Sequence, residues 1–158
     1  MGNIIQNDKD CITIACSKGY LWQKTLELLN QMGYQFDNDL TESRQLFTFD
    51  TTGTLKLMKV RPWDVPVYLE QGAADLGMVG KDVLIEQSAN VLELQDLKFG
   101  GCRLVVAGPE SEKDTFKRHN IRVATKYEAA TLGYFQQNAI RCIPIKMYGA
   151  MELAPTTG

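Results

Sequence analysis

Residues 72–84 have the sequence GAADLGMVGKDVL. A short apolar stretch at 76–79 is followed directly by Gly80, Lys81 and Asp82. After the strand predicted at residues 76–79, Gly80 allows a sharp turn. A helix beginning near Asp82 would point unpaired N–H groups and the positive end of its dipole outward. Lys81 adds a positive charge, and Asp82 either caps the helix or holds the water shell of a magnesium ion. The arrangement suits a phosphate group, although an ordinary turn with a capped helix explains it equally well.

Other candidate residues follow predicted strands in the same way. Open α/β sheets bind ligands at the carboxyl ends of their strands, so cations at these positions are candidates for holding an anion. Each alone has a plain alternative, because a single surface lysine or arginine is usually only solvated. Glu152 differs from them, since it is a lone acid in an apolar run and is expected to be buried or helix-facing with a partner. The candidates at or near strand ends are Lys18, Gly19, Arg44, Arg61, Gly80, Lys81, Thr125 and Lys126.

Strand-like and helix-like segments alternate along the chain, which predicts a largely parallel α/β sheet. A turn of hairpin character separates the strands at 45–49 and 55–60. Gly100 and Gly101 predict a hinge, so we expect a first lobe at residues 1–98 and a second at 99–158, with the ligand in a cleft between them. The other predicted strands are residues 12–16, 76–79, 91–94, 102–107, 121–124 and 142–146, and the predicted helices lie at about 21–32, 64–72, from 82, and 128–137.

The composition restricts the class of protein. The chain has 158 residues, 44% of them hydrophobic, which is enough for one compact α/β unit or two small lobes. A net charge of -2 and a pI near 5.4 argue against nucleic-acid and membrane-surface binding. The first residues lack the apolar core of a signal peptide, so a cytoplasmic location is expected. The four cysteines show no ligand spacing and are predicted to be buried structural thiols, and a single histidine, His119, argues against histidine-based triads.

Seven motifs occur in one order along the chain and together resemble the ATP phosphoribosyltransferase catalytic subunit. The resemblance extends from residue 12 to 155. It implies an α/β fold similar to type II periplasmic binding proteins, with two lobes around a cleft. It also implies the first step of histidine biosynthesis, in which N1 of the ATP adenine attacks C1 of phosphoribosyl pyrophosphate and pyrophosphate leaves with the help of substrate-bound Mg²⁺. The motifs are SKG at 17–19, SR at 43–44, RPWDVP from 61, GAADLGMVGKDVL from 72, CRLVVA from 102, VATKY from 123 and YGAMELAP from 148.

The resemblance also implies roles for individual residues. Because the adenine nitrogen is the nucleophile, the protein has to supply positioning and charge stabilisation rather than a reactive side chain. Arg44, Arg61 and Lys81 are the expected catalytic residues, and no protein-bound metal is expected. The expected substrate-binding residues are Lys18, Gly19, Tyr20, Gly80, Asp82, Thr125, Lys126 and Glu152.

The chain departs from the family pattern at three places. Tyr20 and Gln45 stand where basic residues are common, and each lost charge-assisted contact would cost about 1.5 to 3 kcal/mol. No run such as DxxxTGxT precedes Gly158. The second lobe is therefore expected to be incomplete, without the loop that cradles the ribose phosphate. These departures leave an alternative open, a non-catalytic nucleotide-binding or interaction module derived from the family.

The partners expected from the resemblance are proteins as well as substrates. The chain has no room for a C-terminal regulatory domain and so looks like the short form of the family. That form works with a regulatory subunit similar to histidyl-tRNA synthetase. An exposed apolar edge at residues 151–153 further favours a homodimer.

Overall fold

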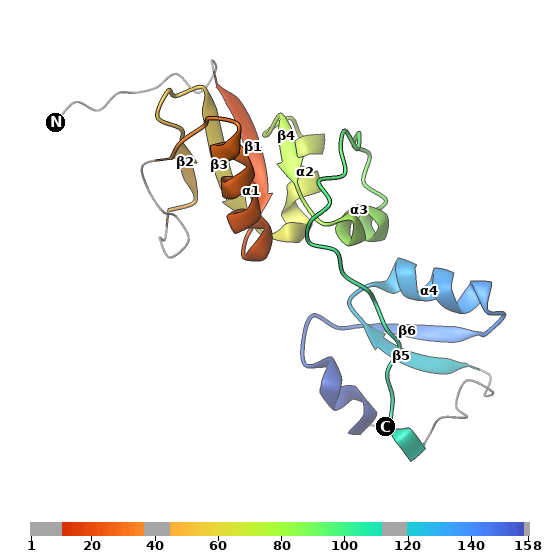
Figure 1. Ribbon diagram of the computed structural model, residues 1–158. Helices are drawn as coiled ribbons and strands as arrows, with labels where there is room; N and C mark the ends of the chain where they lie inside the picture. Colours follow the sequence, from red (N-terminus) through yellow and green to blue (C-terminus); the bar gives the residue numbers. More distant parts are fainter. Residues whose placement is uncertain (1–10, 37–44, 112–119, 157–158) are drawn as a thin grey trace. The chain divides into compact units, whose positions relative to one another are not determined.

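The computed structural model describes residues 11–36, 45–111 and 120–156. Strands and helices alternate along the chain, as predicted, and Figure 1 shows their arrangement. Most elements begin and end within two residues of the predicted bounds. They are β1 (Ile12–Ser17), α1 (Tyr20–Gln31), β2 (Phe47–Phe49), β3 (Leu55–Val60), the 3-10 turn η1 (Pro62–Asp64), α2 (Val65–Glu70), β4 (Leu76–Met78), α3 (Lys81–Gln87), β5 (Ile121–Thr125), α4 (Glu128–Gln137), β6 (Cys142–Lys146) and the 3-10 turn η3 (Met151–Thr156).

The contacts divide the chain into two compact units. The first comprises Met1–Leu84 and Ala89–Gly101, and the second comprises Ile85–Ser88 and Cys102–Gly158. The chain thus changes unit after Gly101, beside the paired glycines, whereas the sequence places the boundary after residue 98. Residues Ile85–Ser88, which include the last residues of α3, are grouped with the second unit, and local sequence does not predict this.

The first unit is built on a four-stranded sheet with the order β2-β3-β1-β4. β1 pairs in parallel with β3 on one side and with β4 on the other, whereas β2 pairs antiparallel with β3. The antiparallel pair is the predicted hairpin. β1 is the inner strand between two parallel neighbours, and such strands are usually covered on both faces by helices; residues Ile14 to Ser17 are all buried.

Successive side chains of β1 point to opposite faces of the sheet and pack against different helices. Ile14 and Cys16 share a cluster with Trp22 and Leu29 of α1. Ala15 instead packs with Val65 of α2 and with Ala74. The sheet of the first unit therefore has α1 on one face and α2 on the other.

The packing of α2 against β4 depends on a glycine. A Cβ added at Gly77 would lie 2.7 Å from Leu69 Cδ1 and 2.9 Å from Val65 Cγ1, both on α2. We expect Gly77→Ala to lower the free energy of unfolding by about 1–3 kcal/mol, because this interface has no room for a methyl group. Urea unfolding measures the effect. The matched control is Gly101→Ala, since nothing lies within 4 Å of a Cβ there; equal losses in the two variants would contradict the prediction.

Asp50 stabilises the turn between β2 and β3 by hydrogen bonds. Its carboxylate accepts hydrogen bonds from the backbone N–H of Leu55 (2.7 Å) and Thr52 (3.0 Å) and from the Thr52 hydroxyl. Burial by itself would raise the pKa of Asp50, but the hydrogen bonds outweigh burial and hold the pKa below its ordinary value. The ionised carboxylate is thus part of the folded hairpin.

Because the pKa of Asp50 is lowered in the folded state, its contribution to the free energy of unfolding depends on pH. The stabilisation is present above the pKa of the unfolded chain, about 3.9, and is lost as the pH falls through the folded pKa. We expect Asp50→Asn to cost about 1–3 kcal/mol at neutral pH, because buried donors lose a charged acceptor. The difference from the parent should shrink below about pH 4. Denaturant unfolding at several pH values measures it, and a constant difference down to pH 3 would refute this role.

The second unit contains a parallel β5-β6 pair connected through α4. Phe135 of α4 is fully buried and is the one buried side chain among the described residues of this unit. The bounds of α4 and β6 agree with the predicted ones. β5 and β6 form a two-stranded sheet of their own, and as in the first unit, where only β2 runs antiparallel, the pairing is parallel, as the alternation predicts.

Two predicted strands are absent from the described residues. Residues 91–94 and 102–107 contain neither helix nor strand, although their apolar composition favours one. Leu92 and Val105 are 87% and 69% exposed. A strand forms only where a neighbouring strand supplies hydrogen-bond partners, and none of the described strands pairs with these segments. The predictions for these two segments were therefore wrong.

The cysteines are all free, but they do not share one environment. Cys16 is buried, Cys11 and Cys142 are partly buried, and Cys102 is exposed. The prediction of buried thiols is wrong for Cys102, because the strand expected to bury it does not form.

None of the described helices is long and apolar enough to cross a membrane.

Candidate functional site

The ends of β1 and β3 bring two of the predicted cations to one edge of the sheet. Ser17 pairs with Val60 as the last residue of each strand. The backbone N–H of Lys18 donates to Val60 O at 3.1 Å, and Arg61 follows immediately as an exposed residue. Because paired strands lie about 4.8 Å apart, Lys18 and Arg61 leave the sheet as near neighbours.

The end of β4 lies on the other side of β1. Cys16 pairs with Met78, and the Ser17 hydroxyl donates to Met78 O at 3.2 Å. Gly80 and Lys81 follow two and three residues later. The carboxyl ends of β3, β1 and β4 therefore place three predicted cationic residues at the same edge of one sheet (Figure 1).

Helix α1 begins at this edge and has no acidic group of its own there. Gly19 adopts φ 82°, a left-handed conformation that favours glycine and lets the chain turn directly from β1 into α1. The first turn of α1 contains no acidic residue, and the N-cap residue forms no side-chain hydrogen bond. The N–H groups and the dipole of a 12-residue helix thus add to the attraction for an anion.

Lys81, the first residue of α3, forms an ion pair with Glu93. Both side chains are more than half exposed, so the pair is worth about 0–1 kcal/mol. Glu93 was not among the sequence candidates, because it lies twelve positions beyond Lys81 and no local motif links the two. A multiply charged anion at the sheet edge can compete with this weak pair.

Asp82 belongs to the first turn of α3, and its carboxylate lies against Gly80. A Cβ added at Gly80 would lie 2.2 Å from Asp82 Oδ1, so a side chain at position 80 requires the carboxylate to move. Tyr20 is 55% exposed at the start of α1 and lies close to Gly100. The structure thus places Gly80, Asp82 and Tyr20 beside the predicted cations in the first unit.

The thiol nearest this edge is chemically inert. Cys16 is fully buried, and its Sγ lies 3.3 Å from Thr25 Oγ1 of α1. Burial raises the pKa of the Cys16 thiol to about 11, against a smaller lowering by the hydrogen bond with Thr25. Cys16 therefore stays protonated at neutral pH and cannot serve as a nucleophile.

The remaining candidates lie in the second unit or outside the described residues. Thr125 ends β5, and its hydroxyl is within hydrogen-bond distance of the Tyr127 N–H and the Thr131 hydroxyl, while Lys126 follows as a partly buried residue. Glu152 is exposed in η3, so of its two expected environments, buried or helix-facing, the buried one is wrong; this short 3-10 turn has no buried residue. Arg44 and His119 lie outside the described residues.

Sequence reasoning missed one carboxylate that closes a helix end. Glu86 accepts hydrogen bonds from the backbone N–H groups of Ala129 and Ala130 at the start of α4. A separation of 43 and 44 residues leaves no local signal for such a contact. Across residues 11–36, 45–111 and 120–156, no three His, Cys, Asp or Glu side chains gather as a metal site.

Comparison with known proteins identifies the family. Residues 61–158 match the family model described as HisG, ATP phosphoribosyltransferase. The ATP phosphoribosyltransferase of Caldanaerobacter subterraneus subsp. tengcongensis is 43% identical over 149 residues, which cover 94% of this chain and 70% of that protein. The enzyme of Syntrophomonas wolfei is 44% identical over 152 residues, with the same coverage.

A solved structure supports the same assignment. The chain superposes with a TM-score of 0.67 on the ATP phosphoribosyl transferase (HisG:HisZ) complex from Thermotoga maritima, at 26% identity, covering 93% of this chain and 69% of the other. The chain thus spans about 70% of the length of these relatives. Sequence and fold agree, and the chain belongs to the HisG family of ATP phosphoribosyltransferases.

Proposed function

We propose that this chain catalyses the first step of histidine biosynthesis, joining ATP to phosphoribosyl pyrophosphate. N1 of the adenine attacks C1 of the ribose and forms the new bond with inversion at that carbon. The bond from C1 to the pyrophosphate oxygen breaks, and its electron pair leaves with pyrophosphate. The observation that carries the proposal is family membership over 94% of the chain, joined with a sheet edge from which Lys18, Arg61 and Lys81 emerge.

The residues at this edge would act by charge and position. Both substrates are densely anionic, and negative charge grows on the departing pyrophosphate. The N–H groups at the start of α1, with Lys18, Arg61 and Lys81, would hold phosphate groups and stabilise that charge. Since the ion pair of Lys81 with Glu93 is exposed, exchanging the carboxylate for a phosphate costs little.

We also propose that this chain has the finer features of the family. They include a two-lobed fold similar to type II periplasmic binding proteins with its cleft, substrate contacts from Thr125, Lys126 and Glu152, and catalysis by Arg44. Mg²⁺ would arrive bound to phosphoribosyl pyrophosphate, where it offsets charge on the leaving group. The carboxylate of Asp82, at the sheet edge, could hold the water shell of that ion.

A protein partner is also part of the proposal. The Thermotoga maritima relative is described as a HisG:HisZ complex. A regulatory subunit of the HisZ kind, similar to histidyl-tRNA synthetase, would pair with this chain in the cytoplasm. We further expect the chain to form a homodimer, because Leu153 is 60% exposed on η3.

Pyrophosphate release tests the proposed reaction. We expect release that requires both ATP and phosphoribosyl pyrophosphate, measured with a coupled pyrophosphatase assay on the chain alone and with a HisZ-type subunit. Calorimetry distinguishes the alternative of a nucleotide-binding module. Saturable ATP binding without pyrophosphate release under either condition would favour that module and reject the enzymatic proposal.

A further inference from the structure

The start of α4 has no cap from its own sequence. The helix runs from Glu128 to Gln137, and its N-cap residue, Tyr127, makes no side-chain capping hydrogen bond. The first N–H groups of any helix lack partners within the helix, so an uncapped start exposes donors and the positive end of the dipole. In the first unit, the start of α1 has this open character. The start of α4 differs.

The carboxylate of Glu86, a residue of α3, caps the start of α4. Oε1 of Glu86 accepts the Ala129 N–H at 2.9 Å, and Oε2 accepts the Ala130 N–H at 3.0 Å. Both carboxylate oxygens are thus used on consecutive backbone donors. Glu86 lies on α3, but by its contacts it belongs to the second unit, together with α4.

The loop that joins β5 to α4 is held from its other side by Thr125. The Tyr127 N–H donates to Thr125 Oγ1 at 3.0 Å, and Thr131 Oγ1 lies 3.1 Å from the same oxygen. Thr131 also donates to Tyr127 O at 2.6 Å. Lys126 lies between these fixed points, so the backbone that carries it is bounded by Thr125 on one side and by the Glu86 cap on the other.

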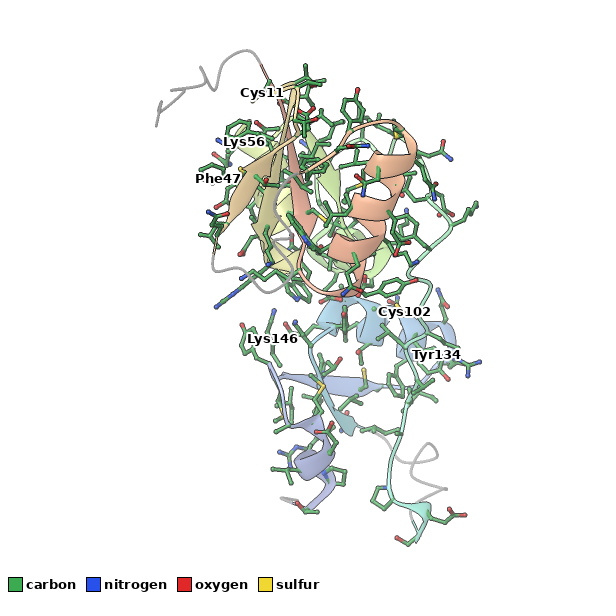
Figure 2. The ribbon with its side chains drawn as sticks, turned by 60° about the vertical axis from the view of Figure 1, so that its left-hand side comes forward. Cys11, Phe47, Lys56, Cys102, Tyr134 and Lys146 are labelled. Carbon is green, nitrogen blue, oxygen red and sulfur yellow. The ribbon has the colours of Figure 1, made fainter. Side chains whose placement is uncertain are left out.

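Carboxylates around the start of α4 disfavour a phosphate on the Ala129 and Ala130 N–H groups themselves. Glu128 forms an ion pair with Lys146 at 2.9 Å. The hydrogen bond and charge of Glu128 raise the pKa of Lys146, and the Glu86 charge adds to the rise. Two carboxylates therefore act on the Lys146 ammonium, which Figure 2 labels at the end of β6. The positive end of the α4 dipole is thus already offset by the Glu86 carboxylate, and the nearby Lys146 ammonium by Glu128.

We propose that Glu86 is a positioning residue that fixes the β5–α4 loop, so that Thr125 and Lys126 are held for substrate. This rests on the proposed function, in which those two residues contact substrate. Glu86 acts through the Ala129 and Ala130 amides rather than by touching substrate. The helix that carries Glu86 begins with Lys81, so one helix bears a candidate catalytic cation and the residue that orders a second candidate loop.

Amide hydrogen exchange tests the cap without any need for activity. In Glu86→Ala, exchange at the Ala129 and Ala130 amides should rise about tenfold, as expected for a lost helix cap. Exchange at Leu57, in the core of the first unit, should not change. Glu86→Gln keeps one acceptor oxygen and should give an intermediate value. Unchanged exchange at Ala129 and Ala130 in Glu86→Ala would overturn the proposal.

Steady-state kinetics tests the positioning role. In Glu86→Ala, the KM for ATP or phosphoribosyl pyrophosphate should rise about three- to tenfold, within the range of a lost cap, while kcat stays within about twofold. Glu86→Gln should recover part of this loss. Glu27→Gln is the control, because it neutralises an exposed acid on α1 that forms an ion pair with Lys24.

The outcomes separate this proposal from the proposed function. Faster amide exchange with both KM values unchanged would make Glu86 a purely structural cap and overturn the positioning role. If the parent chain released no pyrophosphate, the proposed function would fail. Exchange at Ala129 and Ala130 would then still decide whether Glu86 caps α4.

Discussion

Replacing Lys81 by alanine is expected to lower kcat/KM for pyrophosphate release by roughly tenfold to more than a hundredfold. A charge-assisted contact to a phosphate group contributes about 1.5–3 kcal/mol, and the transition state carries more charge on the leaving pyrophosphate than the ground state does. The fold should remain intact, because Lys81 is exposed and its partner Glu93 is also exposed. Initial rates with both substrates varied measure the effect.

A matched control exists for this lysine on α1. Lys24 is a second lysine in an ion pair with a glutamate, Glu27, at 2.6 Å, but it lies within the helix rather than at a strand end. Lys24→Ala should leave kcat/KM within about twofold of the parent, as most exposed ion pairs contribute little. Equal losses in Lys24→Ala and Lys81→Ala would show that the position at the sheet edge has no special role.

Replacing Trp22 by alanine should cost about 3–5 kcal/mol of unfolding free energy. The side chain is 1% exposed and packs in the α1-facing cluster with Ile14, Leu55 and Leu57. The Lys59 ammonium also lies 5.4 Å from the centre of the Trp22 ring. Removing the ring leaves a cavity at the base of the helix that follows Lys18 and Gly19. Urea unfolding of the two proteins gives the difference directly.

Trp22→Phe distinguishes the stabilisation by the apolar ring of Trp22 from the cost of its buried Nε1–H group. Among the residues that the structure describes, the buried Trp22 Nε1 group has no hydrogen-bond partner, so it contributes a desolvation cost and no compensating bond. A phenylalanine keeps most of the apolar contact and removes that group. We expect this variant to lose less than half of what Trp22→Ala loses. A loss as large as that of Trp22→Ala would contradict the view that the apolar ring carries the stabilisation.

A second aromatic contact on this sheet lies at its edge rather than in its core. Lys56 of β3 lies 4.9 Å from the ring centre of Phe47 on β2, and Figure 2 shows the two side by side. Phe47 is half exposed, so this contact adds less to stability than the Trp22 cluster does. The difference between Phe47 and Trp22 explains why the largest stability effect is expected at α1.

Local sequence signals correctly predicted those strands and helices whose formation depends mainly on their own residues. The apolar run of β1, its Lys18-Gly19 turn and the Gly80-Lys81 junction all predicted a strand end followed by a helix, and the structure has both. The strand order β2-β3-β1-β4 could not be predicted in this way, because pairing partners are far apart in the chain. That order is what brings Lys18 beside Val60.

The wrong predictions share one physical cause. Residues 91–94 and 102–107 have the composition of strands, yet a strand also needs a paired neighbour, and composition does not provide it. Glu152 was expected to be buried or helix-facing because its neighbours are apolar, but it is exposed in η3. The Glu86 cap and the Glu93 ion pair were missed for the same reason, since both are long-range contacts.

Titration of the chain with inorganic pyrophosphate, followed by backbone amide NMR shifts, tests most directly whether the edge of the first sheet binds phosphate groups. The largest shifts are expected at residues 18–22, 61 and 80–82, where α1 begins beside the ends of β3 and β4. Little change is expected at Ala129 and Ala130, whose N–H groups are taken by Glu86. Shifts concentrated at those two amides, with none at residues 18–22, would contradict the assignment.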